Sequence, residues 1–287
     1  MKIMISTLAI ARNIVIVAIF TLCFTACDLI SGLSDWSIPT EIHVKSLNDA
    51  QKKLAKHTFN GDSPDDPVNI YVNFDIGDLS RPDNDYLRLI EIIGDSGLYA
   101  TLELGKAKMG GTTVFTNPPL NEAVKGMDKI VEFSFPGVTT SIMADTNGIS
   151  PFFFYENLVH VNNYGGSNIT HIGDYAFSSC KSLELVNLYN AKIVGREAFQ
   201  GCENLRYICL PALLETISDK AFFDCSSLER LEMPRNPPAL GDDVFLGSTP
   251  GTLRLSIERE NLGLYHTWLT ENASKFNNNG KNVNFKV

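Results

Sequence analysis

The residues of this chain best suited to chemistry are its five histidines and six cysteines. None of the histidines stands in a metal-binding spacing such as H-E-x-x-H. The sequence also lacks the G-x-S-x-G motif of serine hydrolases and the P-loop of nucleotide-binding proteins. One pair could serve as a nucleophile and its base, Cys209 with His160. The strands that carry these two residues decide whether they can meet.

Strands are predicted from a pattern that recurs around a phenylalanine. Phe177, Phe199, Phe222 and Phe245 follow one another at intervals of 22, 23 and 23 residues. After the first three, the apolar residues alternate, as in Leu183, Val186 and Leu188; Leu205, Ile208 and Leu210; and Leu228, Leu231 and Met233. Alternation with a period of two indicates a short strand with one buried face. Units of this length bury their apolar edges only by stacking, and stacking forms a continuous parallel sheet.

These stretches resemble the BspA-like leucine-rich repeats of bacterial surface proteins, whose pattern is approximately I-G-x-x-A-F-x-x-C-x-x-L-x-x-I-x-L-P. Pro211 and Pro234 match its last proline, whereas Tyr189 departs from it. The resemblance implies an α/β fold, a leucine-rich-repeat solenoid with a curved parallel β-sheet. We expect about six repeats over 109–257, regular in 169–245 and degenerate in 109–168.

Two degenerate copies support the upstream extension. Met109–Phe115 echoes the I-G-x-x-A-F element with one extra residue, and Ile130–Pro136 matches the strand. The stretch Leu158–Tyr164 matches the strand poorly.

Three cysteines fall three residues after the repeated phenylalanines: Cys180, Cys202 and Cys225. Stacking places them in a column. A metal-binding row is one interpretation, but zinc needs four converging ligands, so we favour small apolar residues with a weak S–H donor. Disulfides between adjacent copies stay open. We predict no metal and no cofactor.

Cys209 and His160 both fall on the outward side of the predicted sheet, two strands apart. At about 4.8 Å per strand they lie roughly 10 Å from each other, whereas a nucleophile and its base need about 2.6–3.2 Å. His160 is also level with Tyr207 rather than with Cys209. We therefore expect no catalytic dyad and no enzyme.

The outward residues form two rows across the predicted strands. One row contains Glu132, His160, Leu185, Tyr207 and Arg230, and the next contains Ser134, Asn162, Asn187, Cys209 and Glu232. Apolar and aromatic side chains stand where a purely solvated sheet would carry charge. The predicted partner-binding residues are Leu185, Tyr189, Tyr207, Tyr164 and Arg230. Scattered surface aromatics are the alternative interpretation.

The chain begins with Lys2, Arg12 and an uncharged apolar run, Ile14–Ala26, that is typical of a secretory signal. Its 13 residues fall short of the roughly 20 that a membrane-spanning helix needs. Phe24-Thr25-Ala26-Cys27 resembles the lipobox of bacterial lipoproteins, which implies lipidation of Cys27. An ordinary cleaved signal is the alternative.

This interpretation divides the chain into a signal peptide at 1–26, a lipidated cysteine with a tether at 27–40, an N-terminal α/β cap at 41–108, the repeats, and a C-terminal cap at 258–287. Within the N-terminal cap we expect helices after Ser46 and over Asp85–Ile93, with strands over Asn69–Ile76 and Leu98–Leu104.

The C-terminal cap is predicted to follow a last repeat strand at Leu253–Ile257. A helix over Glu260–Phe276 comes next, with Leu262, Leu269, Ala273 and Phe276 on one face, and the final strand contains Val283, Phe285 and Val287. The aspartates in Gly61–Pro67 do not match a calcium-binding loop, so a solvated turn is expected there.

The net charge of −9 argues against a protein that holds nucleic acid through a basic surface. Without residues 1–26, which contain Lys2, Arg12 and no acidic residue, 22 basic and 33 acidic side chains remain, a net charge of −11. We expect a lipid-anchored protein of the bacterial cell envelope, at the outer membrane or cell surface rather than the plasma membrane. The resemblance implies adhesion to host or extracellular-matrix proteins or to other cells. A structural component inside the envelope is the alternative.

Overall fold

Residues 41–57, 60–162, 168–187, 189–248, 254–257 and 259–276 are described by the computed structural model. They belong to one unit, Pro39–Val287. The predictions for Cys27, for the tether, for Tyr164 and for the strand at 283–287 lie outside the described residues. In the described part of the chain, no helix is both long and apolar enough to cross a membrane.

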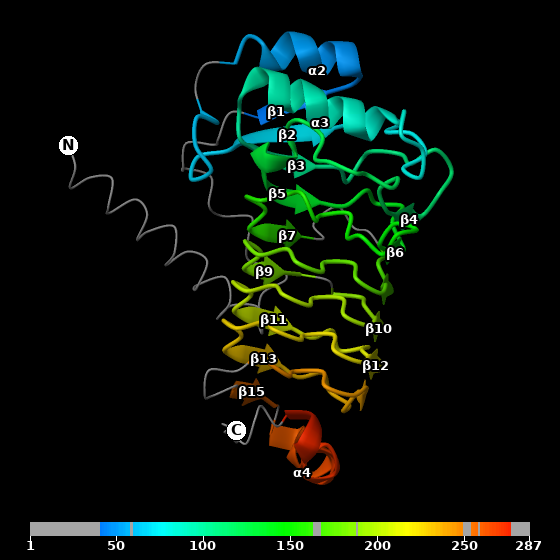
Figure 1. The fold of residues 1–287 in the computed structure, drawn as a ribbon, viewed down its shortest axis with the longest axis vertical. Coiled ribbons are helices and arrows are strands. Elements are labelled where there is room, and N and C mark those ends of the chain that lie inside the picture. Colours follow the sequence, from blue (N-terminus) through cyan, green and yellow to red (C-terminus); the bar gives the residue numbers. More distant parts are fainter. Residues whose placement is uncertain are drawn as a thin grey trace, which may run out of the picture. The chain divides into compact units, whose positions relative to one another are not determined.

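Nine parallel strands follow one another in chain order across the principal sheet (Figure 1). They are β1 (Glu41–Val44), β2 (Val68–Val72), β3 (Ala100–Glu103), β5 (Ile130–Ser134), β7 (His160–Asn162), β9 (Leu185–Val186), β11 (Tyr207–Cys209), β13 (Arg230–Glu232) and β15 (Arg254–Ser256). The predicted leucine-rich-repeat solenoid with a parallel sheet is confirmed. The sheet passes without a break from the predicted cap at 41–108 into the repeats.

A second parallel sheet of six very short strands was not predicted. Its strands are β4 (Val114–Phe115), β6 (Ser141–Ile142), β8 (His171–Ile172), β10 (Ile193–Val194), β12 (Thr216–Ile217) and β14 (Ala239–Leu240). Each ends in a buried apolar residue. The coils from β5 onward therefore consist of one strand of each sheet joined by turns.

Phenylalanine rings form a continuous stack inside the coils. The rings of Phe177, Phe199, Phe222 and Phe245 are nearly parallel, with centroids 5.1, 5.2 and 5.5 Å apart. Phe152 extends the stack, 5.2 Å from Phe177. This confirms that the repeated phenylalanines share one position in the coil.

The predicted alignment of Met109–Phe115 with the I-G-x-x-A-F element is wrong. Phe115 lies in β4, and β4, β6 and β8 place it in register with Ile142 and Ile172, the isoleucine position of the element. In the next coil, that of Ile142, Phe152 fills the phenylalanine position after the turn Asp145–Ile149 and stacks on Phe177. Phe115 nevertheless stacks on Phe152 at 5.6 Å, because its larger side chain reaches the same layer.

The three column cysteines are buried and have free thiols. No disulfide joins Cys180, Cys202 or Cys225. The thiols of Cys202 and Cys225 donate to the carbonyl oxygens of Phe177 and Phe199, each over 3.1 Å. These contacts confirm the prediction of small buried residues that act as weak donors.

The two helices of the N-terminal segment are α2 (Leu47–Leu54) and α3 (Asp85–Ser96). As predicted, the Ser46 hydroxyl caps α2 by accepting from the Asp49 amide. Asn84 caps α3 by accepting from the Leu87 amide at 2.8 Å. The helix α3 joins the repeats through Tyr86, whose buried hydroxyl lies 2.6 Å from that of Tyr155.

At the other end, η3 (Arg259–Asn261), α4 (Leu262–Glu271) and η4 (Ala273–Phe276) follow β15 (Figure 1). The predicted extent of the helix, Glu260–Phe276, is wrong, because α4 ends at Glu271; Leu269 of the expected apolar face, which also contained Leu262, Ala273 and Phe276, is partly buried against the core. The buried residues of α4 are Tyr265 and Trp268. They donate to the carbonyl oxygens of Pro234 and Pro238, so their polar atoms fix the helix to the last coil. The remaining short element, η2 (Met127–Lys129), leads directly into β5.

Candidate binding surface

The outward face of the principal sheet carries the rows that the sequence predicts. Pairing of β5, β7, β9, β11 and β13 aligns Glu132, His160, Leu185, Tyr207 and Arg230 in that order. The next row places Ser134 beside Asn162 and Cys209 beside Glu232. The residues between the rows point into the core, so a partner on the sheet side could reach the side chains of these rows, except for the buried Ser134 and Asn162.

His160 and Cys209 do not meet. They lie on β7 and β11, with β9 between them, and His160 is in register with Leu185 and, one strand further, with Tyr207. The His160 ring instead contacts Glu132, with Nδ1 3.0 Å from Oε1. The register therefore agrees with the expectation that this pair forms no dyad.

Apolar and aromatic side chains gather on β9, β11 and the turn after β9. Tyr207 is 39% exposed and Tyr189 is 48% exposed. Leu185, half-buried, is the strand neighbour of Tyr207. Arg230, the next residue in the row, contacts Glu232 at 3.1 Å while nearly half of its side chain stays exposed. We call Leu185, Tyr189, Tyr207 and Arg230 the apolar patch.

The same face continues onto β1, β2 and β3, which sequence reasoning assigned to a cap and did not search for surface residues. The register adds Glu41, Asn69 and Thr101 to the first row, and His43, Tyr71 and Glu103 to the second. The alternation of Val68, Ile70 and Val72 was the signal that could have revealed it, since it turns Asn69 and Tyr71 outward.

This added part of the face is polar and partly buried. Burial raises the pKa of Glu103, and the charge of Glu132 adds to the rise, while the nearby Ser134 hydroxyl opposes it. Burial also raises the pKa of Tyr71, and the carboxylates of Glu41 and Glu103 act in the same direction. A carboxylate with a raised pKa is one whose charge its surroundings do not compensate.

The column cysteines are chemically quiet. Burial raises the pKa of Cys180 to about 12 and also raises those of Cys202 and Cys225. Thiols with such pKa values are almost fully protonated at neutral pH and are poor nucleophiles and metal ligands. No group of three or more His, Cys, Asp and Glu side chains in the described ranges could hold a metal ion.

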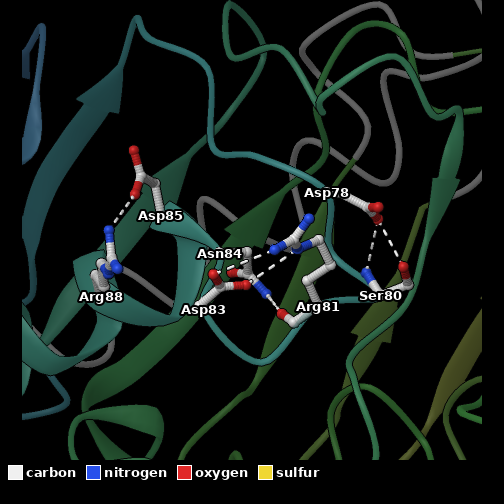
Figure 2. Close-up of polar contacts among 7 residues, drawn as sticks. All are labelled: Asp78, Ser80, Arg81, Asp83, Asn84, Asp85 and Arg88. Atoms are coloured by element: carbon white, nitrogen blue, oxygen red, sulfur yellow. Dashed lines mark hydrogen bonds and ion pairs between the residues drawn. The ribbon is translucent and has the colours of Figure 1, made fainter.

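The acidic loop before α3 is satisfied by its own contacts. Figure 2 shows Ser80 donating to Asp78 and Arg81 paired with Asp83, while the Asn84 amide donates to the Arg81 carbonyl. The hydrogen bonds from Ser80 and Arg81 lower the pKa values of Asp78 and Asp83. The contacts within this loop therefore fix the conformation of the chain just before α3.

Comparison with known proteins places the repeats. Residues 147–265 match the family model described as BspA type Leucine rich repeat region, in six copies. A leucine-rich repeat protein from Bacteroides ovatus, solved by crystallography, is 24% identical, and the match covers 67% of this chain and 46% of that chain at a TM-score of 0.38. The match thus spans less than half of that protein's length. No curated protein matches the chain.

Proposed function

Because residues 147–265 match the model of the BspA type leucine-rich repeat region, we propose that the protein is a non-enzymatic adhesion protein of the bacterial cell surface. It binds host or extracellular-matrix proteins, or other cells, through the outward face of its principal sheet. Leucine-rich repeats commonly mediate protein–protein interaction and are generally non-enzymatic, which supports the binding role.

The observation that carries the proposal is the apolar patch. Tyr207 on the sheet face is 39% exposed and Tyr189 in the turn after β9 is 48% exposed, in the same patch as a leucine and an arginine. Tyrosine and arginine are enriched among the residues that dominate binding energy at protein interfaces, and aromatic side chains lose little conformational entropy when they are ordered.

We propose that the protein is held at the membrane by lipid on Cys27. Acyl chains contribute about 0.8 kcal/mol per buried CH₂, and more than one chain makes a stable anchor. The net charge of −11 for residues 27–287 leaves little electrostatic attraction to an anionic membrane, so the lipid has to supply the attachment. Mass spectrometry of the mature N-terminus tests this, and an unmodified residue 27 contradicts it.

The binding role is tested with the soluble protein from residue 28 onward on immobilised fibronectin, laminin and collagen. We expect the double variant Tyr189→Ala/Tyr207→Ala to weaken binding at least tenfold, since interface tyrosines contribute about 2 kcal/mol or more when they are central. Phe153→Ala is the matched control, because Phe153 is 46% exposed but lies outside the sheet rows. Equal loss in the two variants would move the site away from the sheet.

Protease treatment of intact cells separates adhesion from a structural role inside the envelope. A surface protein is cleaved on intact cells. Cleavage only after lysis would instead favour the envelope component.

A further inference from the structure

Glu103 and Ser134 occupy adjacent positions on the outward sheet face, in register across β3 and β5. Tyr71 flanks Glu103 on the other side, on β2. Glu132 is two residues before Ser134 on the same face and in register with Thr101. The surroundings of the Glu103 carboxylate on this face are therefore hydroxyl groups and a second carboxylate. We call Glu103 and Ser134 the acidic notch.

The two members of the acidic notch interact with each other and with no basic side chain of the described chain. Glu103 takes part in none of the ion pairs among the described residues, although it is half-buried. Ser134 is 1% exposed, and its hydroxyl lies beside Glu103, where it acts as a hydrogen-bond donor that lowers the pKa of the carboxyl group, while no group of the described chain donates to its oxygen.

The basic side chains that the described part of this face carries from β1 to β13 are already paired. His43 contacts Glu41, His160 contacts Glu132, and Arg230 contacts Glu232. Glu103 is therefore a carboxylate on this face that has no basic side chain of the described chain as an ion-pair partner. A metal ion does not fit, since the described residues hold no cluster of three or more possible ligands.

We propose that the acidic notch receives the guanidinium or ammonium group of an arginine or lysine side chain of the bound protein. Such a group carries several N–H donors, so it can bind both oxygens of the Glu103 carboxylate, beside which the buried Ser134 hydroxyl lies. This inference rests on the proposed binding function and specifies the chemistry of the partner.

The spacing of the strands also sets the distance between the acidic notch and the apolar patch. From Glu103 on β3 to Tyr207 on β11 there are four strand spacings, or about 19 Å. An extended chain covers that distance in roughly six residues. The partner is therefore an extended segment with a basic side chain about six residues from an apolar one that meets Leu185 and Tyr207.

The test uses argininamide as the probe and the backbone amide resonances of the soluble protein as the readout. We expect a saturable shift at Glu103 and Ser134 with millimolar affinity, and at least tenfold weaker binding in Glu103→Gln. Glu215→Gln, which removes an exposed carboxylate paired with Lys192 outside the sheet rows, leaves the affinity unchanged. Ser134→Ala weakens binding less than Glu103→Gln does, because it removes a hydroxyl group beside the Glu103 carboxylate but no charge.

Three results would overturn the proposal: no saturable shift up to 100 mM argininamide (roughly the limit for a single charged contact), shifts spread over the exposed carboxylates, or an unchanged affinity in Glu103→Gln. The probe needs no protein partner. Loss of matrix binding in the tyrosine variant without argininamide binding would thus leave the proposed function standing and refute the acidic notch alone.

Discussion

The phenylalanine stack predicts a measurable coupling between neighbouring coils. The rings of Phe177 and Phe199 lie 5.1 Å apart and within 5° of parallel, and each has a further ring on its other side, Phe152 at 5.2 Å and Phe222 at 5.2 Å. Replacing either by leucine keeps an apolar side chain but removes two ring contacts. At about 0.5–1.5 kcal/mol for each aromatic pair, each single variant should lose about 1–3 kcal/mol of unfolding free energy.

The double variant isolates the contact between the two rings. In Phe177→Leu/Phe199→Leu the shared contact is lost once rather than twice, so we expect the double variant to be about 0.5–1.5 kcal/mol more stable than the sum of the single losses predicts. The control cycle pairs Phe177 with Phe222, whose rings are separated by that of Phe199. Its effects should add within about 0.5 kcal/mol.

Urea unfolding at 25 °C, followed by circular dichroism, measures both cycles. The slope of the unfolding free energy against urea must stay constant across the variants, because repeat proteins can lose two-state behaviour. A coupling for Phe177 with Phe199 no larger than that for Phe177 with Phe222 refutes the idea that the stacked rings hold adjacent coils together.

Two further predictions concern single residues. Ser179 has a left-handed φ of 63°, and Gly201 holds the same position of the next coil at 69°; Ser179→Gly should raise the unfolding free energy by about 0.5–1 kcal/mol and Gly201→Ser should lower it, and thermal melts that move both variants in one direction would contradict this. Because the folded-state pKa of Glu103 is raised, the native protein binds more protons than the unfolded chain between the ordinary and the raised pKa, so wild-type stability falls as pH rises through that window. Glu103→Gln should therefore be the more stable protein at pH 7 and lose that advantage below about pH 4; melting temperatures that differ by the same amount at both pH values would refute the assignment.

The sequence predicted the parts of the fold that rest on long-range repetition. The spacing of Phe177, Phe199 and Phe222 indicated the coil, and the alternation around Ile208 indicated the strand and its outward neighbours. The short sheet was missed because two-residue strands such as Ile193–Val194 are too short to show a period.

The other differences between the prediction and the structure arise where a coil carries a different side chain at a repeated position. Tyr155 stands at the cysteine position of its coil and bonds to Tyr86, a substitution that no single-coil pattern reveals. Part of the candidate surface was found from the alternation on β9, β11 and β13. The acidic notch was not, because it depends on which strands neighbour β3 and on the burial of Ser134, neither of which is local in the sequence.

The order of the strands in the principal sheet fixes the distances between contact positions on its outward face. Each strand contributes one position to each row, so contact positions are separated by whole multiples of about 4.8 Å. Inserting a copy of a regular coil between the acidic notch and the apolar patch would increase their separation by one such step, with the two ends of the stack left as they are. A lineage could in this way alter which partner it fits by copying a coil of 22 or 23 residues, without redesigning any contact residue.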